Sequence, residues 1–410
     1  MRSLQLGAGW FPEEGGGLER YFFEMRQALP EVGVSTSGLV IGSPQIKHSS
    51  GGDVTAFAQS TMRLPDRLRG LRRAVSTELA TGSFDVVAGH FALYALPILQ
   101  MVRELPLVFH FHGPWAAERR MEGGKWFKTT VQRTLERHVY HRAECLITLS
   151  DAFKQMLMTD YGIRENKIRV IPGGMDTDRY AISETRDEAR QILGWQRDRP
   201  IVLAVRRLTR RMGLSELIAS VEIIRRSVPD VLVLIAGRGI LAGELESQIA
   251  AAGLKNHVQM LGFLPDSKLP LAYRAADITV VPSLALEGFG LSAAESLAAG
   301  TPALVTPVGG LPEVVRDLPA ELVIVATGVN ALAHRITAIL KGTLPVPSAK
   351  ECQEHCRRRF DWAVVGQKIR AVYAEACGSA DVVPEEARLT RHAAVVDRDG
   401  ETSEVIPGLS

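Results

Sequence analysis

Residues 200–226, PIVLAVRRLTRRMGLSELIASVEIIRR, join a short apolar run, a basic turn that closes on a glycine, and an amphipathic segment. The apolar run predicts a buried strand, and the helical spacing of the leucines, isoleucines and valine behind it predicts a helix. A strand followed by a helix that covers the sheet is the repeating unit of parallel α/β folds. The stretch therefore predicts an α/β protein.

The same alternation occurs on both sides of this stretch. Apolar runs that predict strands in the first half are LQLGAG, FDVVAGH, LPLVFHFHG, ECLITLS and IRVIPGG, and those in the second half are PIVLAV, DVLVLIAG, HVQMLGF, ITVVPS and TPALVTP. A polar, charged segment at 176–198 separates the two series. A chain of 410 residues is also too long for one ordinary core. We therefore expect two doubly wound, Rossmann-like domains that face an interdomain cleft.

The domain boundaries follow from this rhythm. We expect residues 1–178 to form an N-terminal Rossmann-like domain, 179–360 a C-terminal one, and 361–377 a helix that crosses back to the first domain. Residues 378–410 are polar, charged and without periodicity, which predicts a disordered tail.

Composition narrows the class of protein. A net charge of +2 does not favour nucleic-acid binding, and no apolar run approaches the roughly 18 residues of a membrane span. The N-terminus meets acidic residues before any leader-like apolar stretch develops. Cys352, His355 and Cys356 are close in sequence but lack zinc-site spacing, so we expect no metal. We expect a cytoplasmic protein.

Ligands of open α/β sheets bind in loops at the carboxyl ends of strands, and two such loops stand out in the first half. In PEEGGGLERY, a glycine run precedes a predicted helix, where backbone N–H groups can approach a phosphate or sugar; a flexible surface loop is the alternative. In FHFHGPW, His110 and His112 alternate along a strand end and point to the same face. His112 can hydrogen-bond a sugar hydroxyl or a developing charge, or it can be an ordinary polar residue at a sheet edge.

Two further loops follow strands of the second half. The arginines of RRLTRRMGL suit a diphosphate, because guanidinium groups bind phosphate oxygens in bidentate fashion; a solvated basic loop is the alternative. In LEGFGLSAAESLAAG, residues 286–300, glycines free the backbone before a helix that begins near Leu291 and ends at Gly300. Glu287 and Glu295 flank the exposed N–H groups of that helix start, and two carboxylates suit the vicinal diols of sugars.

The spacing of Glu287 and Glu295 resembles the E-x7-E signature of the retaining glycosyltransferases of family 4, which have the two-domain GT-B fold. The resemblance covers residues 1 to about 377. RVIPGGMDTDRY, IAGRG, VQMLGF and TPVGGLPEVV are similar to family stretches and occur in the family's order. In this family the N-terminal domain binds the acceptor and the C-terminal domain binds the nucleotide sugar, which is what the resemblance implies here.

The resemblance also assigns roles to single residues. It implies that Glu295 holds the nucleotide ribose, that Glu287 contacts the donor sugar, and that His112 lies near the transferred sugar. The remaining positions that it carries over are backbone donors to sugar and phosphate at Phe289, Gly290 and Leu291, the loop glycines Gly16 and Gly17, Gly237 in the donor site, and the diphosphate ligand Arg207.

Two positions depart from the family pattern G-R-L-x-x-x-K-G. The glycine before Arg207 is Arg206 in this chain, and the lysine, a second diphosphate ligand, is Met212. We expect the neighbouring Arg211 to supply the missing cation, since its forked head can reach a phosphate from an adjacent position. Arg210 should then face solvent.

The function that the resemblance implies is transfer of a hexose from a nucleoside diphosphate sugar to a hydroxyl acceptor, with retention. The acceptor would be a glycan, a lipid-linked glycan or a small molecule, as in polysaccharide or glycoconjugate biosynthesis. No cofactor or metal is expected, because arginines and a helix N-terminus neutralise the diphosphate.

Three alternatives remain. LIAGRGILAGEL contains a G-x-G-x-x-A pattern typical of NAD-dependent oxidoreductases, but the next predicted strand ends in Gly262 and Phe263 without the acidic residue that grips the ribose. A catalytically silent nucleotide-sugar- or glycan-binding relative would keep the fold. A GT-B-shaped sugar-nucleotide epimerase would share the architecture but not the E-x7-E spacing.

A peripheral membrane contact is a further hypothesis. MRLPDRLRGLRR carries five arginines against one acid, and WAAERRMEGGKWFKTTVQR interleaves Trp115, Trp126 and Phe127 with basic residues. Basic residues with interfacial aromatics suit anionic lipid surfaces, such as the inner face of a membrane. Ordinary solvated helices would carry the same pattern.

Overall fold

Seven strands of the N-terminal half form one parallel sheet in the computed structural model, which describes residues 1–378. The strand order is β3-β2-β1-β4-β5-β6-β7. The strands are β1 Arg2–Leu6, β2 Ser35–Ile41, β3 Val54–Ala58, β4 Val86–Gly89, β5 Leu107–Phe111, β6 Cys145–Thr148 and β7 Ile168–Val170. β2 and β3 were not predicted, because β2 begins with polar residues and a threonine interrupts the short apolar run of β3.

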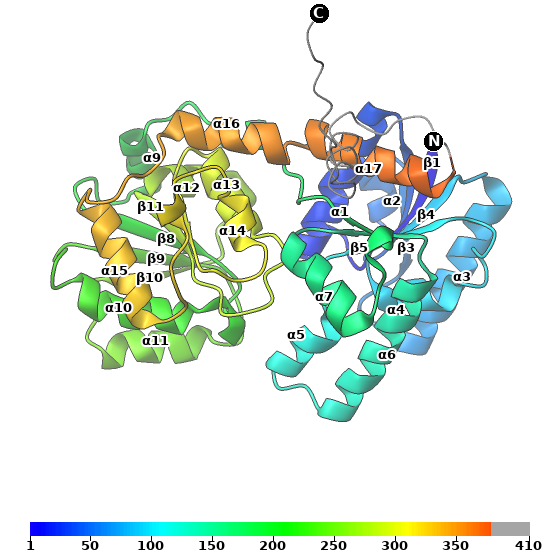
Figure 1. Ribbon diagram of the computed structural model, residues 1–410, viewed down its shortest axis with the longest axis horizontal. Helices are drawn as coiled ribbons and strands as arrows, with labels where there is room; N and C mark the ends of the chain where they lie inside the picture. Colours follow the sequence, from blue (N-terminus) through cyan, green and yellow to red (C-terminus); the bar gives the residue numbers. More distant parts are fainter. Residues whose placement is uncertain (379–410) are drawn as a thin grey trace, which may run out of the picture.

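Five strands of the C-terminal half form a second parallel sheet, in the order β10-β9-β8-β11-β12. The strands are β8 Ile201–Val205, β9 Leu232–Ala236, β10 Val258–Gly262, β11 Ile278–Val281 and β12 Ala303–Val305. All five fall within the predicted apolar runs. The prediction of two Rossmann-like α/β units is therefore confirmed, and Figure 1 shows them as two lobes side by side.

Helices cover both faces of the two sheets (Figure 1). Those of the first lobe are α1 Gly17–Ala28, α2 Ile46–Ser49, α3 Leu64–Thr81, α4 Ala92–Ala95, α5 Trp115–Met121, α6 Trp126–Arg142 and α7 Asp151–Tyr161. Those that follow are α8 Thr177–Tyr180, α9 Arg186–Leu193, α10 Leu214–Ile224, α11 Ala242–Ala251, α12 Leu269–Ala275, α13 Leu291–Ala298, α14 Leu311–Val314, α15 Val329–Leu340, α16 Ala349–Phe360 and α17 Trp362–Ala376.

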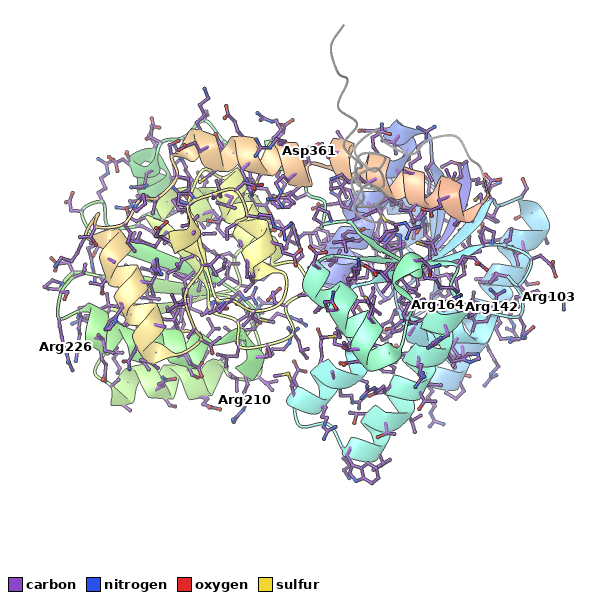
Figure 2. All side chains as sticks on the ribbon, in the orientation of Figure 1. Arg103, Arg142, Arg164, Arg210, Arg226 and Asp361 are labelled. Carbon is purple, nitrogen blue, oxygen red and sulfur yellow. The ribbon has the colours of Figure 1, made fainter. Side chains whose placement is uncertain are left out.

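The last two helices run along one side of the molecule, from the second lobe to the first (Figure 1). α16 ends at Phe360, and Asp361, labelled in Figure 2, begins α17 by accepting a hydrogen bond from the N–H of Ala363 at 2.9 Å. The buried face of α17, which includes Trp362 and Tyr373, packs in one cluster with residues of α1, β4, β5 and β6. The chain therefore returns to the N-terminal lobe. The predicted tail beyond Gly378 lies outside the described residues.

Each sheet has one point where the strand order reverses direction, and these two points place the functional loops. In the first sheet β1 lies between β2 and β4, and in the second β8 lies between β9 and β11. Ligands of open parallel sheets bind at such switch points, beyond the carboxyl ends of the strands. The loops after β1, β4, β8 and β11 therefore form the expected site. Within residues 1–378, no helix is both long and apolar enough to cross a bilayer.

Candidate active site

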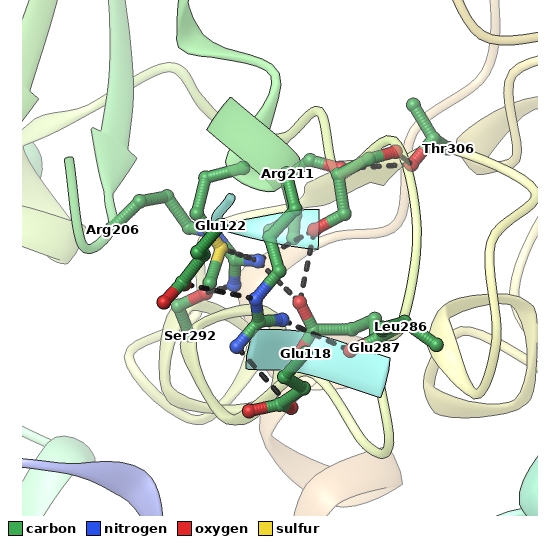
Figure 3. Close-up of polar contacts among 11 residues, drawn as sticks. Glu118, Glu122, Arg206, Arg211, Leu286, Glu287, Ser292 and Thr306 are labelled. Carbon is green, nitrogen blue, oxygen red and sulfur yellow. Dashed lines mark hydrogen bonds and ion pairs between the residues drawn. The ribbon is translucent and has the colours of Figure 1, made fainter. Parts of the chain in front are cut away.

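The loops after β8 and β11 are joined by a buried ion pair between Arg206 and Glu287 (Figure 3). The two side chains are 6% and 14% exposed. Nη2 of Arg206 also donates to Oγ of Ser283 at 2.5 Å, and Nη1 donates to Oγ of Ser292 at 3.2 Å. Arg206 thus ties the first turn of α13 to the end of β11 at the switch point of the second sheet.

This pairing keeps Glu287 charged. Burial alone would raise the pKa of the Glu287 carboxyl, but Arg206, Ser283 and Arg211 together hold that pKa below its usual range. The Nε of Arg206 is buried and has no hydrogen-bond partner among residues 1–378. A buried guanidinium with an unused N–H is suited to an anionic oxygen, since leaving the donor unpaired costs free energy.

The backbone between Glu287 and α13 is shaped for close approach. Gly290 precedes the helix with φ +96°, and Leu286 takes φ +52°, a conformation that a branched side chain rarely adopts. Within residues 1–378, the N–H groups of Gly290 and Leu291 donate no hydrogen bond. Free N–H groups at a helix start favour an anion. The local strain is typical of functional sites.

The side chain of Phe289 points away from this opening. It is 7% exposed, meets Phe360 edge-on, and would overlap a Cβ on Gly173 at 2.5 Å. Phe289 therefore anchors the loop in the core, and only its backbone is available to a ligand. Gly173 therefore makes room for the ring.

Glu295 lies one turn into α13 and is 5% exposed. Its two carboxylate oxygens accept hydrogen bonds from the hydroxyls of Tyr180 and Tyr273, each at 2.7 Å. Arg20 of α1 approaches to 4.0 Å from the other lobe and also contacts Asp266. The carboxylate is therefore held in one orientation while each oxygen keeps a lone pair for a ligand.

The side chains of Arg211 and Arg210, both in the loop after β8, differ in their exposure to solvent. Arg211 is buried, and its guanidinium donates to the Leu286 carbonyl at 3.0 Å and pairs with Glu118 of α5 at 3.4 Å (Figure 3). Arg211 therefore braces the loop against the N-terminal lobe, while its Nε is buried without a hydrogen-bond partner among residues 1–378, so its expected role as a phosphate ligand stays a prediction. Arg210 faces solvent as predicted, with its side chain 77% exposed (Figure 2).

Arg206 takes the place that the pattern assigned to a lysine at 212. Met212 is buried in the core beside α10, and its Sδ lies 2.8 Å from Nη2 of Arg206. The two departures from the family pattern therefore touch each other: the guanidinium of one lies against the thioether of the other. This placement makes Arg206 a candidate for the second cation in addition to Arg211.

Arg207 lies on the exposed side of the same loop. Burial raises the pKa values of Glu19 in α1 and Glu118 in α5, and the charge of Arg207 acts against both increases. Arg207 therefore faces the N-terminal lobe across the cleft. Its side chain is free to turn toward a ligand there.

Gly237 has a structural reason to be glycine. Its φ is +144°, and a Cβ at this position would lie 1.8 Å from the carbonyl oxygen of Arg206. The residue therefore lets the loop after β9 pass against the backbone that carries the arginines. The second glycine of the G-x-G pattern, Gly239, is similarly pressed against the backbone of Leu208.

The N-terminal lobe contributes its own switch-point loops. Gly16 precedes α1 in an extended conformation, and a Cβ built on it would collide with the carboxylate of Glu19, whereas nothing lies within 4 Å of a Cβ built on Gly17. His112 follows β5, and its carbonyl oxygen lies 3.3 Å from a Cβ built on Gly288. The histidine therefore lies at the junction of the two lobes, next to the loop of Glu287.

Contacts between the lobes enclose the site. The carboxylate of Glu313 accepts hydrogen bonds from the N–H groups of Asp151 at 3.0 Å and Ala152 at 3.3 Å, which begin α7. The pair of Arg20 with Asp266 closes the opposite side. In the described part of the chain, no group of three or more His, Cys, Asp and Glu side chains could hold a metal ion.

Sequence reasoning missed several residues of the site. Ser283, Tyr180 and Tyr273 were not proposed, and Arg206 was included only as one of the arginines of its loop, because their roles depend on contacts between distant segments. His90 also escaped notice, although it ends the apolar run FDVVAGH just as His112 follows FHF. A histidine after each of two neighbouring parallel strands could have indicated that His90 and His112 lie close together.

The architecture and the site together define the class of GT-B glycosyltransferases. Two Rossmann-like sheets meet at their switch points, and a paired arginine and glutamate precede a helix whose N-cap is glycine. Residues 15–179 match the family model described as Glycosyltransferase Family 4, and residues 185–359 match Glycosyl transferases group 1. The two ranges together take in most of the chain. The protein belongs to glycosyltransferase family 4. The oxidoreductase alternative is thereby excluded.

Three similar proteins illustrate the relationship. The phosphatidyl-myo-inositol mannosyltransferase of Mycolicibacterium smegmatis is 27% identical over 378 residues, 89% of this chain and 91% of that protein. An uncharacterised glycosyltransferase of Methanocaldococcus jannaschii is 34% identical over 180 residues, which cover 42% of this chain and 44% of that protein. The structure of Anabaena HepE in complex with UDP and glucose superimposes with a TM-score of 0.75 at 22% identity, covering 92% of this chain and all of that one.

Proposed function

We propose that this glycosyltransferase moves a hexose from a nucleoside diphosphate sugar to a hydroxyl acceptor and retains the anomeric configuration. The observation that carries the proposal is the Arg206–Glu287 pair at the start of α13, where a buried cation, an ordered carboxylate and unused backbone N–H groups converge. A diphosphate needs the cation and the N–H groups, and a sugar needs the carboxylate.

Each part of the donor has a partner in this arrangement. Arg206 and Arg207 bind the diphosphate together with the N–H groups of Gly290 and Leu291. Glu287 accepts hydrogen bonds from hydroxyls of the sugar, and Glu295 accepts those of the ribose. These assignments rest on position and charge. Because two arginines and a helix start neutralise the diphosphate, the reaction needs no metal ion.

Retention is what the E-x7-E resemblance implies, and we propose that it proceeds without a glycosyl-enzyme intermediate. Glu287 is paired with Arg206, and both oxygens of Glu295 accept from tyrosines, so neither carboxylate is placed as a free nucleophile for a glycosyl-enzyme intermediate. The acceptor oxygen would then attack the anomeric carbon on the face that the diphosphate leaves. The bond from that carbon to the diphosphate oxygen breaks, and the acceptor's proton passes to the departing diphosphate.

The N-terminal lobe would bind the acceptor through the loops after β1 and β5. The free space beside Gly17 at the start of α1 and the partly exposed His112 support this. Similar proteins are named for a lipid acceptor, phosphatidyl-myo-inositol, and for UDP with glucose. We propose a glycan or lipid-linked glycan as the acceptor, in the synthesis of a polysaccharide or glycoconjugate.

A donor screen tests the proposal. The purified protein is incubated with UDP-, GDP- and ADP-sugars, and release of the nucleotide is measured with and without candidate acceptors. The anomeric configuration of the first-formed product is then determined by proton NMR. We expect hydrolysis or transfer with one donor class and a retained configuration. Binding without turnover for every donor would support a catalytically silent relative instead.

A contact with an anionic membrane is proposed as a second property of the N-terminal lobe. Trp126 and Phe127 begin α6 and are 72% and 50% exposed, beside Lys125 and Lys128. Trp115, by contrast, packs edge-on against Phe91 and does not belong to the exposed start of α6. Exposed aromatics among lysines suit a lipid interface.

Liposome flotation at physiological salt tests the membrane contact. The wild-type protein should float with anionic vesicles and not with neutral ones. Trp126→Ser should reduce the floating fraction. Equal flotation of the two proteins, or none for either, would contradict the proposal.

A further inference from the structure

A chain of buried hydrogen bonds runs beneath His112 into the first sheet. Nε2 of His112 lies 3.0 Å from Nδ1 of His90, and Nε2 of His90 lies 3.0 Å from Oε1 of Gln5. Nε2 of Gln5 donates to Oγ of Ser3 at 2.9 Å. The hydroxyl of Ser3 in turn lies 3.2 Å from the carbonyl oxygen of Ser35 in β2. The chain thus connects the cleft to the backbone of a neighbouring strand.

The end of this chain fixes the direction of every bond in it. A carbonyl oxygen can only accept, so the single hydroxyl proton of Ser3 is donated to Ser35. The Ser3 oxygen must therefore accept from Gln5, and this requires the amide nitrogen of Gln5 to face Ser3. The amide oxygen of Gln5 then faces His90 and can only accept. Nε2 of His90 consequently carries a proton.

The direction continues from His90 to His112. Burial, with the charges that His110 and His112 would carry, lowers the pKa of His90 well below its usual range, so the ring is neutral. A neutral imidazole with its proton on Nε2 has a lone pair on Nδ1. Nε2 of His112 must therefore be the donor. Burial lowers the pKa of His112 to about 3, so that ring is neutral as well and its Nδ1 carries a lone pair.

A second branch is consistent with this direction. Gln5 also donates to the hydroxyl of Tyr373 at 3.2 Å, and that hydroxyl lies 2.8 Å from Nε2 of His110. Tyr373 can accept from Gln5 and donate to His110. Nδ1 of His110 then donates to the hydroxyl of Tyr21 at 3.3 Å. Each proton in the two branches is donated to one acceptor only, so the two branches can exist together.

We propose that Gln5 and His90 are positioning residues that hold His112 as the Nε2–H tautomer and present its Nδ1 as a hydrogen-bond acceptor for a substrate hydroxyl. His112 is partly exposed, and among residues 1–378 its Nδ1 has no hydrogen-bond partner. A lone pair attracts a hydroxyl proton and repels an oxyanion. The ligand at His112 is therefore a sugar or acceptor hydroxyl, and the phosphate oxygens lie elsewhere. This part rests on the proposed function.

NMR of protein labelled with [13C,15N]-histidine tests the tautomer directly. The His112 signals are assigned by their loss in His112→Asn. We expect the ring shifts of the Nε2–H tautomer in the wild-type protein. A wild-type Nδ1–H tautomer, or an imidazolium at neutral pH, would overturn the proposal.

Two variants test the relay, and a third is the control. Gln5→Glu places a carboxylate beside His90 and stabilises the imidazolium; Nδ1 of His90 would then donate to His112 and switch it to the Nδ1–H tautomer. His90→Phe removes the acceptor and should give a mixture of tautomers. Tyr373→Phe breaks only the second branch and should leave His112 unchanged. An unchanged His112 in both Gln5→Glu and His90→Phe would refute the relay.

Turnover of the donor found in the screen separates the substrate claim from the relay. Gln5→Glu should lower kcat/KM about tenfold, the effect of one neutral hydrogen bond. A switched tautomer with unchanged turnover would mean that His112 does not accept a substrate hydroxyl. If the wild-type protein turns over no donor, the proposed function fails, while the tautomer measurement still decides the relay.

Discussion

Replacing Arg206 by methionine should destabilise the C-terminal lobe in a pH-dependent way. The substitution keeps an unbranched apolar stem but removes the guanidinium that pairs with Glu287, whose side chain is 14% exposed and lies beside Ser283 and α13. Breaking a buried ion pair from one side leaves an uncompensated charge, which costs about 3–5 kcal/mol. We expect a loss of this size at pH 8, since both groups are charged there.

The sign of the pH dependence follows from the pKa of Glu287. In the wild-type protein this pKa is lowered, so the pair stabilises the fold above the unfolded pKa and that stabilisation is lost as the pH falls. Without Arg206, burial is the largest remaining influence and raises the pKa of Glu287. The unpaired carboxylate then destabilises the fold at high pH, and protonation relieves it as the pH falls. The difference between the two proteins should therefore shrink from pH 8 to pH 5.

Urea denaturation at the two pH values measures this difference, with hydrogen exchange of the β8 and β11 amides reporting on the C-terminal lobe. Arg207→Met is the matched control: it removes an exposed arginine next in sequence, and its cost should stay within about 0.5 kcal/mol at both pH values. Adding Glu287→Gln to Arg206→Met should recover part of the loss at pH 8. An equal loss for Arg206→Met at both pH values would refute the reasoning, because the cost would then come from packing rather than charge.

Three further predictions concern the donor site. Arg206→Gly should lower donor turnover by about a hundredfold. Met212→Lys in that background should restore part of the turnover, because the ammonium would occupy the place of the guanidinium. No recovery would contradict the idea that Arg206 replaces a lysine at position 212. Glu295→Gln should raise the KM of the donor about tenfold through the lost charged hydrogen bond, and a KM like that of the wild-type protein would remove the residue from the ribose site. Arg207→Ala should reduce turnover strongly and Arg210→Ala only slightly, as kinetics over a range of salt would show; equal effects would mean that long-range charge is acting.

The fold was largely readable because its signals are local. Each apolar run of the second half became a strand, and the helix predicted from Leu291 begins at that residue. Strand formation there depends on residues that are adjacent in sequence and buried on both faces. β2 and β3 carry weaker local signals, and their places in the sheet are fixed by pairing of β2 with β1 and of β3 with β2.

The sequence by itself determined the α/β class, the two sheets, the E-x7-E pair and the basic loop after β8, because periodicity and spacing are properties of the chain. Only the tertiary structure decided which residues the arginines of this loop contact. Arg206 and Glu287 are 81 positions apart, and Arg211 meets Glu118 on the other lobe. Arg206 meets Glu287 because the strand order places β8 beside β11, and Arg211 meets Glu118 because α5 of the other lobe packs against these loops. The contact between Arg206 and Met212 could not be predicted for the same reason. The sequence gives the type of each residue, but the packing around a long side chain sets its direction.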